Sequence, residues 1–274
     1  MKNYLFLIFC TLFSCKQKTL DFKDGNIFDV QKNLSYGKAK RQKLDVYIPQ
    51  NNSSETVFIM LHGGGWKGGK KEDFNSFMID LMKKFPKNTF VNMNYQLAGY
   101  QQYAIPTQPE NILQAINFIN EKTQKQNQYI LVGASSGAHI SMMYAYHFDT
   151  KKQIKAVVNL VGPAQLGDEG FKKYPDYKFV EKFLISSQSI PKNTKAVDFG
   201  SPVYWILNAV PTISFYGNKD EVVPISQKNI LDSAFEKTNI QNESHEFEGD
   251  HLAFETEENK KIIIEKIENF IQKL

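Results

Sequence analysis

Apolar residues recur along the chain in two alternating patterns from residue 43 to the C-terminus. Short apolar or alternating runs predict strands at residues 43–48, 56–61, 89–95, 129–132, 154–161, 211–216 and 242–247. Between them, apolar residues spaced three and four positions apart predict helices at residues 71–85, 109–122, 138–147, 226–237 and 257–272. Strands that alternate with helices predict an α/β fold, with a mainly parallel twisted sheet covered by helices on both faces. Thr256 stands where it would cap the last helix.

One segment, residues 162–205, interrupts this alternation and is rich in aromatic residues. We interpret it as an insertion that lies over the sheet edge. Its aromatic side chains either form a core of their own or offer flat apolar surface to a ligand. They are Phe171, Tyr174, Tyr177, Phe179 and Phe183.

The N-terminus carries a short positive start followed by an apolar run over residues 4–13. The run is too short to span a bilayer as a permanent helix. It leads into Leu12-Phe13-Ser14-Cys15, which resembles a bacterial lipoprotein signal. The only cysteines, Cys10 and Cys15, both lie in this segment, so the mature chain would hold no disulfide.

We therefore expect three parts: a lipoprotein signal over residues 1–15 with Cys15 lipidated, a tether over residues 16–35, and a folded domain over residues 36–274. The expected location is the bacterial cell envelope, and the lipid would be the only attachment to the membrane. The alternative is a plain secretory signal with a chance cysteine, in which case the protein is secreted.

Composition narrows the choice of function. A chain of 274 residues with 42% hydrophobic and 23% charged residues is ordinary for one large globular domain. The net charge of +4 comes from lysines and arginines spread along the sequence, and no cluster forms a basic patch. We therefore expect no nucleic-acid partner.

Small residues surround two serines in the stretch Gly133-Ala134-Ser135-Ser136-Gly137, between a predicted strand and a predicted helix. This is the G-x-S-x-G nucleophile elbow in the context that it requires. Only Ser135 has glycine two positions before and two positions after it, so Ser135 is the candidate nucleophile. Ser136 would contribute its backbone N–H at the start of the helix, where donors are unpaired. The alternative is a serine that caps a helix in an ordinary turn.

A second glycine motif, His62-Gly63-Gly64-Gly65-Trp66, follows the predicted strand at residues 56–61. Consecutive glycines leave backbone N–H groups accessible, as stabilisation of a tetrahedral oxyanion requires. We expect His62 to brace the loop. The alternative is a flexible turn, which explains neither His62 nor Trp66.

A serine nucleophile needs a base, and the base needs an acid that sets its tautomer. The acid is expected after a late strand, in the loop from Gly217 to Pro224, where we choose Asp220. Glu221 is the competing choice, with a longer side chain. Asp250 could be a second acid, but a surface role is favoured.

For the base we choose His251, which lies in a loop before the final helix. His245 is the alternative, within a strand-like run. His139 and His147 fall on the helix after the elbow, where packed or surface histidines are expected.

These motifs, in this order, resemble the α/β-hydrolase superfamily from about residue 43 to the end. The nearest pattern is that of HGGG-type carboxylesterases, a group with hormone-sensitive-lipase-like, feruloyl-esterase-like and acetyl-esterase-like members and kynurenine formamidases. The resemblance implies an α/β-hydrolase fold whose site residues are Ser135, His251 and Asp220, with oxyanion donors from Gly63, Gly64 and Ser136. Two positions depart from the pattern, Gln96 in place of arginine and Asn111 in place of aspartate. They concern the support of a loop more than catalysis.

The resemblance implies a serine hydrolase that cleaves carboxylic esters through an acyl-enzyme, without a cofactor or metal. Its expected partner is a small-molecule ester with a short acyl group. One alternative is an arylformamidase or a peptidase on the same triad, although the length leaves no room for a propeller domain. The other is a non-catalytic hydrolase-fold binding protein.

Overall fold

The computed structural model describes residues 18–23, 25–51 and 53–274. The apolar segment and Cys15, on which the lipoprotein prediction rests, lie outside the described residues. None of the helices in the described ranges is long and apolar enough to cross a membrane.

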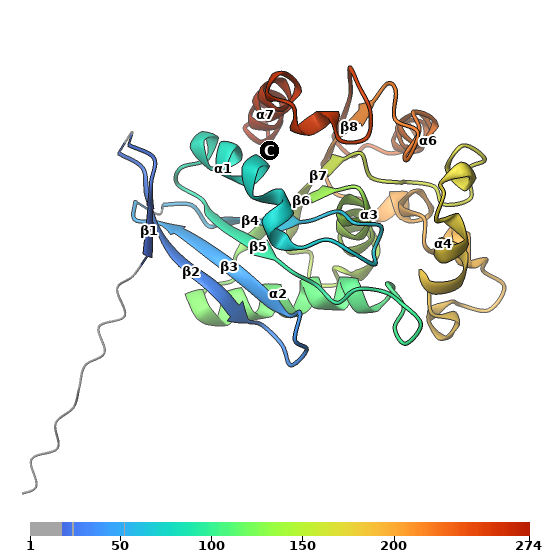
Figure 1. Ribbon diagram of the computed structural model, residues 1–274, viewed down its shortest axis with the longest axis horizontal. Helices are drawn as coiled ribbons and strands as arrows, with labels where there is room; N and C mark the ends of the chain where they lie inside the picture. The colour runs from blue at the N-terminus through green and yellow to red at the C-terminus, as the bar shows by residue number, and fades with distance from the viewer. Residues whose placement is uncertain (1–17, 24, 52) are drawn as a thin grey trace, which may run out of the picture.

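A nine-stranded sheet forms the centre of the described chain, in the order β1-β2-β3-β5-β4-β6-β7-β8-β9 (Figure 1). The first three pairings, β1 with β2, β2 with β3 and β3 with β5, are antiparallel, and the pairings from β5 to β9 are parallel. The strands are β1 Lys18–Asp21, β2 Ile27–Ser35, β3 Lys43–Pro49, β4 Thr56–Leu61, β5 Thr89–Met93, β6 Gln128–Ala134, β7 Ile154–Leu160, β8 Thr212–Gly217 and β9 Asn242–Phe247.

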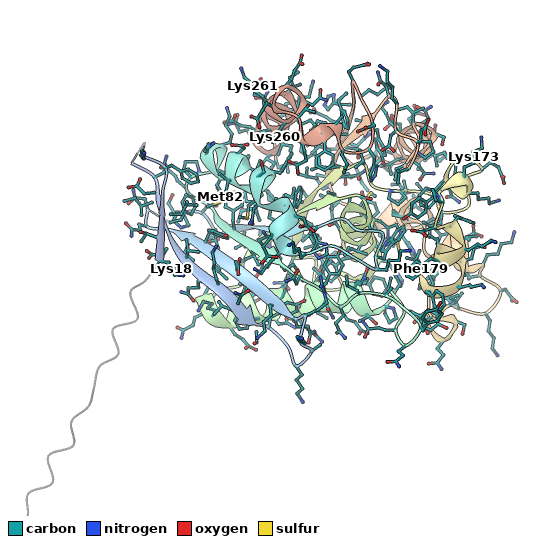
Figure 2. The ribbon with its side chains drawn as sticks, viewed as in Figure 1. Lys18, Met82, Lys173, Phe179, Lys260 and Lys261 are labelled. Atoms are coloured by element: carbon teal, nitrogen blue, oxygen red, sulfur yellow. The ribbon has the colours of Figure 1, made fainter. Side chains whose placement is uncertain are left out.

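Helices cover both faces of this sheet, as predicted. On one face α1 (Asn75–Lys84) and α7 (Glu257–Ile271) pack together and share a hydrophobic core. On the other face α2 (Thr107–Thr123), α3 (Ser136–Met143) and α6 (Ser226–Phe235) share a second core. Figure 2 shows Met82 on the buried side of α1 and Lys261 on the exposed side of α7. Thr256 caps α7 as expected, because its side chain accepts a hydrogen bond from the Asn259 N–H.

Strand β4 explains why the central strands read as continuous apolar runs. Successive side chains of a strand point to opposite faces. Val57, Ile59 and Leu61 pack into the core with α2 and α3. Phe58 and Met60 pack into the core with α1 and α7. Both faces are buried, so every position from Val57 to Leu61 is apolar.

The tether expected over residues 16–35 is wrong for residues 18–21 and 27–35. These residues form β1 and β2, which extend the sheet by antiparallel pairing. Phe28 and Val30 of β2 are buried in the core. The pairing shifts register between Gln31 and Leu34, where Asn33 has a positive φ of 57°. This bulge breaks the apolar alternation and conceals the strand in the sequence.

The insertion at residues 162–205 lies between β7 and β8 and contains short helices, among them α4 (Tyr177–Phe183) and α5 (Ala196–Phe199). It reaches across to the segment after β5, where Ile185 bridges to Ile105 and the Ala104 N–H donates to the Phe183 carbonyl. The insertion therefore crosses above the carboxyl ends of the central strands, and does not simply cover a sheet edge. Ligands of parallel sheets bind at this end.

Candidate active site

Ser135 occupies a sharp turn between β6 and α3. Its backbone has φ 54° and ψ −121°, a left-handed conformation that is costly for a residue with a side chain. The Ser135 N–H donates to the Leu160 carbonyl of β7 at 2.8 Å, which fixes the turn against the neighbouring strand. The turn presents the side chain at the carboxyl end of the sheet, as the nucleophile-elbow motif predicts.

The glycines beside Ser135 are required by close backbone packing. A Cβ atom at Gly137 would lie 2.2 Å from the Leu61 carbonyl oxygen, and one at Gly133 would lie 2.4 Å from the Gly137 carbonyl oxygen. Both neighbours are main-chain atoms and cannot rotate away. The spacing of glycines in the motif therefore reflects the contact of α3 with β4 and β6.

A continuous hydrogen-bond chain joins Ser135, His251 and Asp220. The Ser135 Oγ lies 2.9 Å from the His251 Nε2, and the His251 Nδ1 lies 2.7 Å from the Asp220 Oδ2. A carboxylate only accepts, so Nδ1 carries the proton and a neutral imidazole leaves Nε2 free to accept from the serine hydroxyl. The structure thus brings together three side chains from loops that are far apart in sequence.

Asp220 is held in place by the loop that carries it. Its Oδ1 accepts hydrogen bonds from the Val222 and Val223 N–H groups, both at 2.8 Å. Its side chain is 0% exposed, whereas the side chain of His251 is 16% exposed. The carboxylate therefore has a fixed orientation in a dry setting, and the imidazole faces the open site.

The competing acids and bases lie elsewhere. Glu221 is exposed, and Asp250 bonds the Leu252 N–H of its own turn at 3.0 Å. His245 lies on β9 and is 3.4 Å from Glu243. His147 stacks on Trp205 with the ring centroids 3.7 Å apart.

The glycine loop is braced by His62. Its Nδ1 lies 2.6 Å from the Gly63 carbonyl oxygen, and its ring stacks on Tyr95 with centroids 4.3 Å apart. Burial lowers the pKa of His62 to about 4, so the ring is neutral and Nδ1 donates. The C=O and N–H of a trans peptide point in opposite directions, so a bond that holds the Gly63 carbonyl also aims the Gly64 N–H.

The three predicted oxyanion donors remain available. Within the described part of the chain, no other group accepts a hydrogen bond from the backbone N–H of Gly63, Gly64 or Ser136. Gly63 also lies against the elbow, since a Cβ there would be 3.3 Å from the Ser135 Cβ. The glycine loop therefore adjoins the nucleophile, and its role as an oxyanion hole stays a prediction.

His139 joins the glycine loop to the helix of the elbow. The Trp66 Nε1 donates to the His139 Nδ1 at 3.1 Å, and the His139 Nε2 donates to the Gly200 carbonyl at 2.8 Å. Burial lowers the pKa of His139 to about 4. This neutral side chain thus fastens the glycine loop, α3 and the insertion to one another.

The two departures from the family pattern compensate each other. The Gln96 N–H donates to the Asn111 Oδ1 at 2.8 Å, and the Asn111 Nδ2 donates to the Gln96 Oε1 at 3.1 Å. An uncharged amide pair therefore supports the loop.

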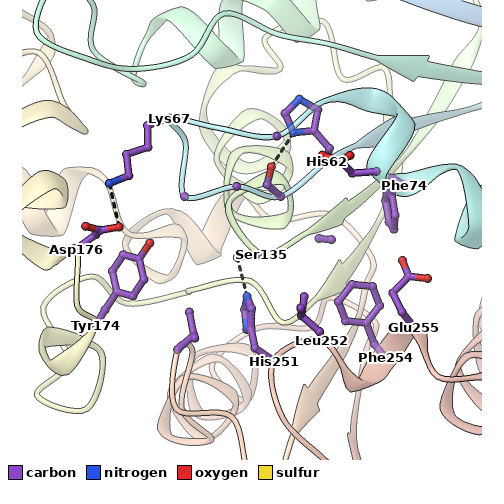
Figure 3. A pocket seen from close by; sticks show the side chains of 17 residues that line it. His62, Lys67, Phe74, Ser135, Tyr174, Asp176, His251, Leu252, Phe254 and Glu255 are labelled. Atoms are coloured by element: carbon purple, nitrogen blue, oxygen red, sulfur yellow. Dashed lines mark hydrogen bonds and ion pairs between the residues drawn. The ribbon is translucent and has the colours of Figure 1, made fainter.

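A cavity of about 550 Å³ opens above Ser135 (Figure 3). One end is formed by Lys67 of the glycine loop and by Tyr174 and Asp176 of the insertion, where Lys67 and Asp176 pair at 2.9 Å. The sequence analysis did not identify most of the residues at the opposite end of the cavity. These residues lie next to His251 or after the glycine loop, but they belong to no recognisable motif. They are Phe74, Leu252, Phe254 and Glu255 (Figure 3).

Most of the aromatic residues of the insertion do not reach this cavity. Tyr174 lines it, but Phe171 stacks on Tyr174, and the Tyr177 hydroxyl donates to the Leu166 carbonyl. Phe179 packs against Phe183. These rings chiefly pack against one another and against the core that is shared with α2, α3 and α6. No group of acidic, histidine or cysteine side chains in the described ranges is arranged to hold a metal ion.

A mainly parallel sheet covered on both faces, a serine on a strained strand-to-helix turn and a glycine loop beside it define an α/β hydrolase. The family model BD-FAE matches residues 44–235, and the chain belongs to this family of α/β-hydrolase type. The predicted resemblance to HGGG-type esterases is confirmed.

Curated relatives are distant. The chain is 23% identical to the isoprenylcysteine alpha-carbonyl methylesterase of Arabidopsis thaliana over 76% of its own length and 52% of that protein. It is 22% identical to the kynurenine formamidase of Danio rerio over 62% of its length and 64% of that protein. The chain thus spans roughly half to two thirds of the length of these relatives.

Solved structures share the fold. A truncated carbohydrate esterase from gut microbiota superposes with a TM-score of 0.70 at 16% identity, covering 89% of this chain and 96% of that one. An arylesterase gives 0.69 at 15% identity, covering 89% and 85%. The family match places the chain among the α/β hydrolases, and these neighbours share its fold.

Proposed function

We propose that this protein is a serine esterase that hydrolyses carboxylic esters of short acyl groups through an acyl-enzyme. The observation that carries the proposal is the hydrogen-bond chain from Ser135 through His251 to Asp220, at 2.9 and 2.7 Å. This hydrogen-bond chain ends at Ser135, which lines a cavity large enough to hold a small ester.

In the proposed reaction the Ser135 Oγ attacks the ester carbonyl while the His251 Nε2 takes its proton. Asp220 stabilises the imidazolium that forms. The negative charge on the carbonyl oxygen is stabilised by the N–H groups of Gly63, Gly64 and Ser136. His251 then gives its proton to the leaving alcohol, and a water molecule releases the acid by the same steps in reverse order.

A short acyl group is favoured by the close packing around the glycine loop. Gly63 lies against the elbow, and a Cβ at Gly65 would lie 2.9 Å from the Tyr174 hydroxyl. The cavity therefore has little room for a long chain beside the glycine loop and Tyr174, and the space that remains lies toward Phe254.

The first test compares p-nitrophenyl esters of acetate, butyrate and a long-chain acid with the wild type and with Ser135→Ala. We expect kcat/KM to be highest for the short esters, and Ser135→Ala to lose activity by several orders of magnitude while remaining folded. Ser136→Ala is the matched control, since it changes the neighbouring serine and leaves the Oγ of Ser135 in place. An inactive Ser136→Ala beside an active Ser135→Ala would contradict the assignment, and a preference for long chains would contradict the acyl specificity.

A formamidase is the second candidate, because the kynurenine formamidases of Danio rerio, Salmo salar and Scheffersomyces stipitis are among the relatives. The same serine can attack a formamide carbonyl. Hydrolysis of an N-formyl aryl amide faster than of the matching formate ester would favour this candidate. A purely binding role is disfavoured, since binding does not need a hydrogen-bonded triad.

We also propose that Cys15 is lipidated and anchors the domain in a bacterial cell envelope. The proposal rests on the apolar segment and on the placement of both cysteines within it.

A further inference from the structure

The cavity above Ser135 is locally acidic in a chain whose net charge is +4. Its lining holds a single lysine, Lys67, against three carboxylates, those of Asp73, Asp176 and Glu255. Charges in a concave site with low-dielectric walls act more strongly than on an open surface. The lining therefore favours a cation over an anion.

Two of these carboxylates already have partners. Asp176 pairs with Lys67 at 2.9 Å, and Asp73 accepts a hydrogen bond from the Lys70 N–H at 2.9 Å. Lys67 therefore compensates the charge of Asp176, and the Asp73 carboxylate is engaged in a hydrogen bond within its own turn.

Glu255 differs from both, because no donor among the described residues bonds its carboxylate. Lys260 is the cation whose charge acts on Glu255, and it is itself paired with Asp80 at 3.0 Å and Glu257 at 2.8 Å. Burial raises the pKa of Glu255, which is the cost of a partly dehydrated carboxylate without a counter-ion. A group from the substrate would supply the missing partner.

The residues that line the cavity with Glu255 indicate which chemical group of a substrate could pair with its carboxylate. Phe74 and Phe254 are 2% and 4% exposed and line the same cavity as Glu255, and Figure 3 shows the three side chains on one side of it. Aromatic rings together with a carboxylate recognise alkylammonium groups, because the rings accept both the apolar substituents and the positive charge. A small anion or a strongly hydrated group finds no donor there.

We infer that Glu255 is a specificity-determining residue that selects substrates with an ammonium group, held between its carboxylate and the rings of Phe74 and Phe254. The inference rests on the proposed esterase function. It concerns which substrate is preferred and adds no chemical step to the reaction.

The test uses pairs of esters that differ only in charge. On the alcohol side, acetylcholine is compared with 3,3-dimethylbutyl acetate, in which carbon replaces the charged nitrogen. On the acyl side, the p-nitrophenyl ester of 4-(trimethylammonio)butyrate is compared with that of 5,5-dimethylhexanoate. The measured quantity is the ratio of kcat/KM for the cation to kcat/KM for its neutral counterpart.

We expect the wild type to prefer the cation in at least one pair by about tenfold, an effect typical of a partly desolvated cation site. Glu255→Gln should remove this preference, and Glu255→Lys should reverse it. Glu258→Gln is the matched control, because Glu258 is an exposed carboxylate of α7 outside the cavity and its removal should keep the ratio.

Hydrolysis of the neutral esters with no preference in either pair would overturn the inference and leave the esterase proposal intact. An equal loss on both members of a pair in Glu255→Gln would also overturn it, since that result indicates a structural role. If the wild type hydrolyses none of the four esters and Ser135→Ala behaves like it, the esterase proposal itself is wrong.

Discussion

Replacing Asp220 by asparagine tests the triad more sharply than removing the nucleophile, because it alters one proton position. In the protein the Asp220 Oδ1 accepts from two backbone N–H groups, those of Val222 and Val223, and Oδ2 accepts from the His251 Nδ1. An asparagine has one oxygen and one NH2 group. The two N–H groups claim the oxygen, so the NH2 group turns toward His251.

The imidazole must then accept at Nδ1 and carry its proton on Nε2. In this tautomer Nε2 cannot take the proton of the Ser135 hydroxyl. The opposite orientation of the asparagine would leave two buried N–H groups facing an NH2 group, at a cost of about 2–6 kcal/mol. The wrong tautomer therefore dominates, and we expect kcat to fall about 10⁴-fold, or about 5 kcal/mol in activation free energy.

The assay is the kcat of p-nitrophenyl acetate hydrolysis, with circular dichroism and Tm to verify that the variant is folded. Glu221→Gln is the matched control, since Glu221 is adjacent, exposed and the competing acid. We expect it to stay within about twofold of the wild type. Near-normal activity of Asp220→Asn, or a large loss in Glu221→Gln, would refute the assignment of the acid.

Three further predictions concern packing, pH and location. Gly137→Ala should lower Tm and activity together, because the new Cβ would lie 2.2 Å from the Leu61 carbonyl oxygen; an unchanged Tm with full activity would contradict the close packing of the elbow. His62 and His139 have pKa values lowered to about 4 by burial, so the unfolded chain binds more protons between pH 6.5 and 4, and stability should fall as pH falls. The expected loss is about 2 kcal/mol per histidine from pH 7 to pH 5 in urea titrations, and a flat profile over this interval would argue against neutral buried rings. Cys15→Ala should move the protein from the membrane to the soluble fraction, whereas a wild-type intact mass without acyl chains would exclude lipidation.

The parallel core of the fold and the members of the candidate triad were readable in the sequence. Strand β4 is apolar from Val57 to Leu61 because both faces are buried, and the helices between the strands keep a regular apolar spacing. The elbow around Ser135 and the glycine loop after His62 are local turns, and the conformation of a turn depends on residues that are neighbours in the chain. Asp220 and His251 could be selected from their order and position, although their contact could not be seen.

Tertiary structure decided the rest, because it depends on residues far apart in sequence. The bulge in β2 interrupts its pattern, so only pairing with β3 identifies it as part of the sheet. The insertion was visible as an aromatic segment, but packing determines that Tyr174 reaches the cavity while Tyr177 bonds the Leu166 carbonyl. Glu255 belongs to no motif: it becomes a candidate for substrate recognition only because folding places it in the same cavity as Ser135 and Phe74, with no hydrogen-bond donor to its carboxylate among the described residues. The charge of a site depends on which residues line it, and the sequence alone does not show which residues folding will bring together.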